Sequence, residues 1–183
     1  SDVRKSKTLI NGLKIIDIGT GSGCIPISLK KNLPEAQLFA LDISPEALGV
    51  AKQNAVLNQT SIDFVQGDIL NLLNEQLKNE KFGIIVSNPP YVTDSEKQEM
   101  HPNVLQHEPH LALFVPNNDP LIFYKAIADF AIKHSEANGI LYLEINENLG
   151  EETIQLLKQM GLKNIELRKD LSGKDRMIRC QLY

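Results

Sequence analysis

The sequence predicts an α/β domain with a mostly parallel sheet, helices on both faces and an antiparallel hairpin at the C-terminal end. Short apolar runs alternate with segments of helical periodicity, an alternation typical of a parallel sheet covered on both sides. The final segment differs, because Ile178, Cys180 and Leu182 occupy alternate positions after a polar turn. Such a hairpin adds one antiparallel strand to a parallel sheet. With 183 residues and 42% hydrophobic content, the chain can bury one proper core.

The elements follow from these patterns along the chain. We expect strands at residues 14–18, 37–42, 62–66, 82–87 and 139–146, with helices after the first, second and fourth. The third of these helices is the periodic stretch from Pro120 to Ser135. The hairpin comprises residues 164–168, a turn at 170–173 and a last strand reaching Leu182. Residues 93–118 show neither period, so we expect an extended loop over the site, since long loops in compact domains are often functional.

A glycine-rich turn, Gly19-Thr20-Gly21-Ser22-Gly23, separates the first strand from a helix start. Glycine lets the backbone turn sharply and approach a ligand closely. A dinucleotide fingerprint would need glycine or alanine where Cys24 stands, which disfavours a diphosphate. Asp42 ends the second strand, 23 residues beyond Gly19, where an acid can accept hydrogen bonds from ribose hydroxyls. The glycine turn together with Asp42 therefore favours a nucleoside ligand without a diphosphate. For the glycines alone, the alternative is a tight corner between a strand and a helix.

The tetrapeptide Asn88-Pro89-Pro90-Tyr91 is the most informative motif. It follows the apolar run 82–87, so it lies at the carboxyl end of a buried strand, where open α/β sheets bind ligands. Proline fixes its own φ and lacks an N–H, so the Pro89 carbonyl and the Asn88 side-chain oxygen can be two rigid acceptors for a planar NH2 group. Tyr91 can lie flat against the same group. The motif predicts a clamp for an amide or an exocyclic amine, with an ordinary strand-ending turn as the alternative.

Together these motifs resemble the class I S-adenosylmethionine-dependent methyltransferases, and within them the family that methylates the side-chain nitrogen of glutamine in peptide chain release factors. The resemblance covers nearly the whole chain and implies a Rossmann-like, mostly parallel seven-stranded sheet. It implies S-adenosylmethionine as cofactor, S-adenosylhomocysteine as product and release factors as partners. The cofactor-binding residues that it implies are Gly19, Thr20, Gly21, Ser22, Gly23, Asp42, Asp68, Ile69 and Asn88. The substrate clamp and catalytic residues that it implies are Asn88, Pro89, Pro90 and Tyr91.

Further matches separate the glutamine methylators from the wider set of enzymes that share the tetrapeptide. These matches are Glu108-Pro109, Ala112-Leu113, Asp119, Phe123-Tyr124, Leu143-Glu144-Ile145, Ser172-Gly173 and Arg176.

The resemblance also bears on domain organisation. It implies one methyltransferase domain over residues 1–183, without the helical amino-terminal recognition domain that family members usually carry. The polar opening, residues 1–7, leads almost directly into the first strand, so we expect a fragment of a longer protein. No apolar run approaches membrane-spanning length, and no apolar stretch follows the basic residues of the opening, so we expect no signal peptide. We therefore expect a cytoplasmic monomer without a membrane partner.

Metal and nucleic-acid sites are not predicted. His101, His107 and His110 match no helical ligand pair, and Cys24 and Cys180 have no metal-ligand spacing. The net charge of −4 argues against broad binding to a phosphate backbone, so direct nucleic-acid binding is not expected. Four polar residues near the predicted site are assigned structural rather than catalytic roles: Glu108, Glu144, Glu147 and Asn148.

The predicted reaction is in-line displacement at the methyl group of the cofactor, with positioning of a weakly nucleophilic amide as the main catalytic effect. Three alternatives remain open at this point. The clamp also fits an exocyclic amine of adenine or cytosine in nucleic acid, which would call for a basic groove or a target-reading domain. The substrate could be glutamine in a ribosomal protein. A cofactor-binding module without activity is the non-enzymatic alternative.

Overall fold

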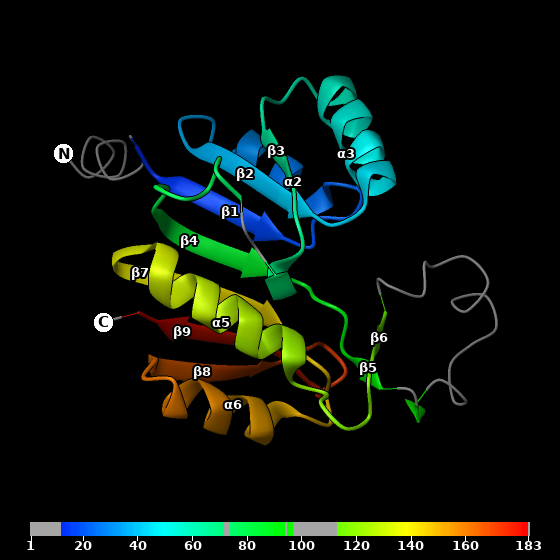
Figure 1. Cartoon of the computed structure of the whole chain (residues 1–183), viewed down its shortest axis with the longest axis vertical. Coiled ribbons are helices and arrows are strands. Elements are labelled where there is room, and N and C mark those ends of the chain that lie inside the picture. Colours follow the sequence, from blue (N-terminus) through cyan, green and yellow to red (C-terminus); the bar gives the residue numbers. More distant parts are fainter. Residues whose placement is uncertain (1–11, 72–73, 94, 97–112, 183) are drawn as a thin grey trace.

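The computed structural model describes residues 12–71, 74–93, 95–96 and 113–182. Its main sheet has seven strands in the order β3-β2-β1-β4-β7-β9-β8 (Figure 1). The strands are β1 Lys14–Ile18, β2 Gln37–Asp42, β3 Asp63–Gln66, β4 Phe82–Ser87, β7 Ser135–Glu144, β8 Lys163–Lys169 and β9 Asp175–Gln181. Neighbours pair in parallel from β3 to β7, whereas β9 is antiparallel to both β7 and β8. The predicted mostly parallel sheet with a terminal antiparallel hairpin is thus confirmed.

Four of the predicted strands coincide with β1, β2, β3 and β4 to within a residue. The strand expected at 139–146 is wrong at both ends, because β7 begins at Ser135 and stops at Glu144. Its early residues follow α5 without a loop, and the pairing with β4 is irregular between Phe82 and Ile84. Asn138 has a positive φ of 63° there. The apolar run marks only the regularly paired part of the strand.

Helices cover the sheet on both faces, as predicted. Helices α2 (Cys24–Asn32) and α3 (Pro45–Leu57) follow β1 and β2, and α5 (Ile122–His134) corresponds to the helix expected at 120–135. In Figure 1, α5 crosses in front of the sheet and α2 lies behind it. Helix α6 (Gly150–Gln159) was not predicted. It packs on β8 and α5.

The expected loop at 93–118 is not wholly irregular. A short parallel pair, β5 (Val92–Thr93) with β6 (Phe114–Val115), brackets it. A 3-10 turn, η1 (Ile69–Asn71), follows β3 and contacts α5. The sequence between Glu96 and Leu113 lies outside the described residues.

The main core lies between the sheet and helices α5 and α6. Its largest buried side chains include Phe82, Tyr124, Ile127, Leu141 and Leu143. A smaller cluster of Ile15, Ala36 and Leu38 lies beneath α2. Because both faces of the central strands are packed, their carboxyl ends are held in fixed register, and the candidate site lies there.

Candidate functional site

The glycine turn and the proline motif meet at the carboxyl ends of β1 and β4. Ile18 pairs with Ser87 in the sheet, and the Ser87 hydroxyl donates a 2.7 Å hydrogen bond to the Ile18 carbonyl. A Cβ added to Gly19 would lie 3.9 Å from the Asn88 carbonyl oxygen. The structure therefore brings together two motifs that lie about seventy residues apart in the sequence.

Backbone hydrogen bonds shape the turn itself. The amides of Gly19 and Thr20 both donate to the Leu41 carbonyl, at 2.8 and 3.0 Å. Gly19, Gly21 and Gly23 have φ values of 73°, 54° and 82°, a left-handed region that glycine adopts without strain. Gly23 also packs closely, because an added Cβ would lie 3.1 Å from the Ala51 Cβ on α3. All three glycines thus allow the left-handed backbone conformation, and Gly23 also allows the turn to pack closely against α3.

Asp42 joins the turn to the end of β2. Its Oδ2 accepts a 2.8 Å hydrogen bond from the Gly21 amide, and its Oδ1 accepts one from the Ser44 amide. A carboxylate has about four lone-pair sites, so capacity remains for a ligand. The Gly67 amide donates to the Asp42 carbonyl at 3.0 Å, which places Asp68 and Ile69 beside this edge. The neighbouring Ile43 is 53% exposed, an apolar surface that the sequence reasoning missed.

Asp17 is a second residue that the sequence reasoning missed. Its side chain is fully buried in β1, and neither carboxylate oxygen has a hydrogen-bond partner within the described residues. Burial raises its pKa to about 7; the nearby Thr20 hydroxyl opposes this shift and the Asp42 carboxylate adds to it. Thr20 Oγ1 is also buried without a partner there. An unsatisfied acid beneath the glycine turn suits a cationic group of a ligand.

The four residues of the proline motif differ in exposure. Asn88 is exposed, Pro89 is buried, and Pro90 and Tyr91 are half-buried. Within the described part of the chain, the Asn88 side chain makes no hydrogen bond, so its amide groups are available to a ligand. The Tyr91 ring packs against the main core, and its hydroxyl donates to Glu144 Oε1 at 3.0 Å. Burial raises the pKa of Tyr91, and the Glu144 carboxylate adds to this, so the hydroxyl stays protonated.

A polar network from β7 and the segment after β5 surrounds Tyr91. Asn146 is 5% exposed and donates from Nδ2 to the Tyr91 carbonyl and to the Glu96 carboxylate. The Asn146 amide donates to the buried Tyr124 hydroxyl at 3.0 Å. Arg176 binds Glu147 and Asp170 close by. Glu144 and Asn148 lie within this network, and their structural role stays a prediction. Glu96 and Asn146 had not been singled out.

Comparison with known proteins identifies the family of this chain. A family model described as the methyltransferase small domain matches residues 5–111, more than half of the chain. The chain belongs to this methyltransferase family. It also superimposes on a methyltransferase from Pyrococcus furiosus with a TM-score of 0.68 and 15% identity, covering 98% of this chain and 80% of the other. The fold expected from the resemblance is thereby confirmed.

Curated relatives are more similar in sequence. A release factor glutamine methyltransferase of Flavobacterium psychrophilum is 55% identical over 170 residues, covering 93% of this chain and 59% of that protein. The protein of the same name from Bacteroides thetaiotaomicron is 45% identical over 165 residues, covering 90% and 59%. The chain therefore spans about three fifths of the length of these relatives.

The remaining features of this methyltransferase domain that bear on a site are its possible metal ligands, its two cysteines and its helices. Among the described residues, no group of three His, Cys, Asp or Glu side chains is arranged to hold a metal ion. His101, His107, His110 and Glu108 lie outside the described residues. Cys24 is exposed beside Ser22, and Cys180 is buried. None of the helices in the described ranges has the length and apolar character that a membrane crossing requires.

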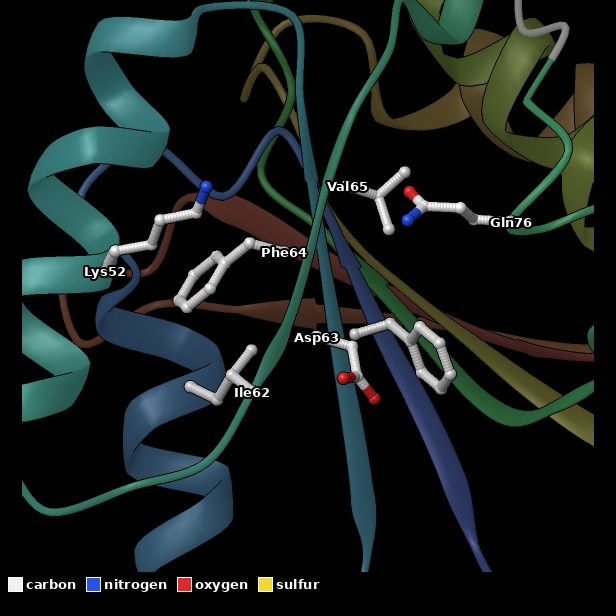
Figure 2. A pocket seen from close by; sticks show the side chains of 7 residues that line it. Lys52, Ile62, Asp63, Phe64, Val65 and Gln76 are labelled. Carbon is white, nitrogen blue, oxygen red and sulfur yellow. The ribbon is translucent and has the colours of Figure 1, made fainter.

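A hollow of about 450 Å³ lies beside the edge strand β3 (Figure 2), and none of its lining residues belongs to the proline motif. Its lining residues are Phe39, Lys52, Ile62, Asp63, Phe64, Val65 and Gln76. Ile62 and Asp63 stand at the amino end of β3, opposite to the end where open α/β sheets bind ligands. The polar members, Lys52, Asp63 and Gln76, are exposed. This hollow is therefore separate from the candidate site.

Proposed function

We propose that this domain transfers a methyl group from S-adenosylmethionine to the side-chain amide nitrogen of a glutamine in peptide chain release factors. The observation that carries the proposal is that the Asn88-Pro89-Pro90-Tyr91 motif and the glycine turn lie next to each other at the carboxyl ends of the paired strands β1 and β4. The names of the relatives at 55% and 45% identity support the choice of substrate. The net charge of −4 favours a protein over a nucleic-acid substrate.

The residues present fit the cofactor. We assign the two unpartnered oxygens of Asp17 to the cationic amine of the methionine part, above which the turn Gly19–Gly23 lies. Asp42 retains acceptor capacity for the ribose hydroxyls. Ile43 and Ile69 supply an apolar edge for the base, and Asp68 supplies a polar group beside it. When bound, the sulfonium of the cofactor supplies an electrophilic methyl group.

The clamp positions the nucleophile. An amide nitrogen is a weak nucleophile because its lone pair is delocalised into the carbonyl, so orientation has to supply much of the rate. Asn88 Oδ1 and the Pro89 carbonyl oxygen accept the two amide hydrogens, and Tyr91 covers the plane of the group. Orientation of this kind contributes up to about 7–11 kcal/mol. The same acceptors stabilise the positive charge that develops on the nitrogen, and the nitrogen can release its proton afterwards without a strong base.

The test is methyl transfer with Asn88→Ala. The chain is incubated with S-adenosylmethionine carrying a labelled methyl group, and with either a release factor or DNA; mass spectrometry then locates the label. We expect label on a glutamine of the release factor, none on DNA, and a loss of turnover of about 100-fold or more in the variant. Calorimetry should show cofactor affinity within a few-fold of the unsubstituted chain.

Asn32→Ala is the matched control, because Asn32 is an exposed amide at the end of α2, remote from the site. Full turnover in Asn88→Ala would refute the clamp. Label on DNA would replace the glutamine substrate by a base amine, and cofactor binding without any transfer would favour the inactive binding module.

A further inference from the structure

Two residues outside the motif control the position of Tyr91. We propose that Asn146 and Glu96 are positioning residues, which hold the Tyr91 peptide close to the end of β7 and so set the position of the Tyr91 ring beside the substrate amide. The inference rests on the proposed function, since it concerns the same site. We call the hydrogen-bonded pair Asn146–Glu96 the latch.

Asn146 fixes the backbone of Tyr91 directly. Its Nδ2 donates to the Tyr91 carbonyl at 3.0 Å and to Glu96 Oε2 at 2.9 Å, so both of its amide hydrogens are used. Its Oδ1 accepts from the Asn148 amide at 2.9 Å, and its own amide donates to the Tyr124 hydroxyl. Asn146 is 5% exposed. A buried side chain with every polar atom bonded has one orientation available, and so has the carbonyl that it holds.

Glu96 completes the latch from the other side. Its Oε2 accepts 2.8 Å hydrogen bonds from the amide and the hydroxyl of Thr93, and its Oε1 accepts one from Asn148 at 2.9 Å. Partial burial raises the pKa of Glu96, but the hydrogen bonds from Thr93, Asn148 and Asn146 outweigh this and leave the pKa below its usual value. The ionised carboxylate therefore ties the end of β5 to the segment that follows β7.

The latch gives Tyr91 a second fixed point, on its backbone. The hydroxyl at the far end of the ring is bonded to Glu144, and the latch holds the backbone carbonyl at the near end. Glu144 is the last residue of β7, and Asn146 follows it by two residues. The hydrogen bonds at this end of the sheet thus fix both ends of Tyr91 and the long axis of its ring. Packing against the main core restricts rotation about that axis.

The chemistry at position 146 requires an amide. Asn146→Asp has nearly the same shape but presents acceptors to the Tyr91 carbonyl and to the Glu96 carboxylate, so it opposes both partners. Glu96→Gln in the same chain supplies a donor in place of one carboxylate oxygen. The double variant Glu96→Gln/Asn146→Asp therefore restores a bond between the two side chains, although the Tyr91 carbonyl still lacks its donor.

The first experiment measures methyl transfer per cofactor-binding site, which calorimetry counts, so that unfolded protein does not contribute. Displacement of a reacting group by about 1 Å can cost about 100-fold in rate, and we expect kcat to fall by about 10-fold to 100-fold in Asn146→Ala and Asn146→Asp. Cofactor affinity should change less than about twofold by the same reasoning, because Asp17, Asp42 and the turn are untouched. Adding Glu96→Gln to Asn146→Asp should recover part of the lost kcat.

The second experiment needs no turnover. The Val92 amide donates to the Leu113 carbonyl and the Thr93 amide to Glu96 Oε2, so hydrogen exchange at these two amides reports the latch. We expect faster exchange there in Asn146→Ala and unchanged exchange in β1 and β2. Asn32→Ala is the control in both experiments.

These outcomes separate the latch from the proposed function. Unchanged kcat per binding site, or unchanged exchange at Val92 and Thr93, would overturn the latch while the methylation assay of the unsubstituted chain stands. Absence of methyl transfer by the unsubstituted chain would overturn the proposed function, and the exchange experiment would still decide whether the latch holds the Tyr91 segment.

Discussion

Replacement of Asp17 by asparagine removes a buried charge and keeps its shape. The carboxyl is fully buried without a partner in the described residues, and its pKa is raised from 3.8 to about 7. Between these two values the unfolded chain ionises while the folded chain stays protonated. This group therefore stabilises the fold most below pH 3.8, and the stability is lost as the pH rises towards 7.

The magnitude follows from the width of this interval. From pH 5 to pH 7 the native chain loses about 1.4 kcal/mol per pH unit through Asp17, or about 3 kcal/mol in total, and above pH 7 the loss is complete. Asparagine does not titrate, although its buried amide without a partner costs about 1–3 kcal/mol at every pH. This constant cost cancels when the same two proteins are compared at pH 5 and pH 8.

Urea denaturation of both proteins at the two pH values is the assay. We expect the free energy of unfolding of Asp17→Asn, relative to that of the unsubstituted chain, to increase by about 3 kcal/mol between pH 5 and pH 8. We also expect the variant to lose affinity for S-adenosylhomocysteine in calorimetry at pH 8. A difference in unfolding free energy that stays constant with pH would refute the assignment of a strained carboxyl at Asp17.

Two further substitutions test the cofactor side of the site. Asp42→Ala should weaken binding of S-adenosylmethionine and its product by about 1.5–3 kcal/mol, through loss of a charged acceptor; calorimetry showing unchanged affinity, or micromolar binding of NAD, would contradict this. Gly23→Ala should lower the free energy of unfolding by about 2–4 kcal/mol, since φ is 82° and an added Cβ would lie 3.1 Å from Ala51 Cβ. Gly161→Ala has a similar φ of 88° but open space around it, so urea denaturation should show a smaller loss, and equal losses would exclude the packing contribution.

The sequence predicted those elements whose residues carry their own signal. Largely apolar runs located β1, β2 and β4, because a strand buried on both faces needs apolar residues at most of its positions. The same rule failed at β7, where Ser135 to Gly139 are paired irregularly and need no apolar run. Helix α6 had a signal that was overlooked: acidic Glu151 and Glu152 in its first turn, and Gly161 just beyond its end.

The residues of the candidate site also differ in whether the local sequence could predict them. The glycine turn and the proline motif are contiguous in the sequence, and their type and spacing indicated a ligand. Asp17 is a single polar residue within an apolar run, and its burial arises from β2 and β4, which flank it only in the folded sheet. Asn146 and Glu96 lie 50 residues apart, and no local pattern connects them. Pairs of this kind become visible only in three dimensions.

The pairing of β1 with β4 sets the spacing between the two halves of the chemistry. The cofactor-side residues come from β1, β2 and β3, the clamp from β4, and within the main sheet β1–β4 is the one pairing that joins these sets. A slip of one residue along this pair would move the clamp by about 3.3 Å and turn its side chains to the opposite face. That displacement is as large as the separation of two reacting atoms, about 3–3.5 Å. Substitutions at Ile16, Ile18 or Ile85, deep in the sheet, can therefore change the rate of transfer without altering any residue that touches a ligand.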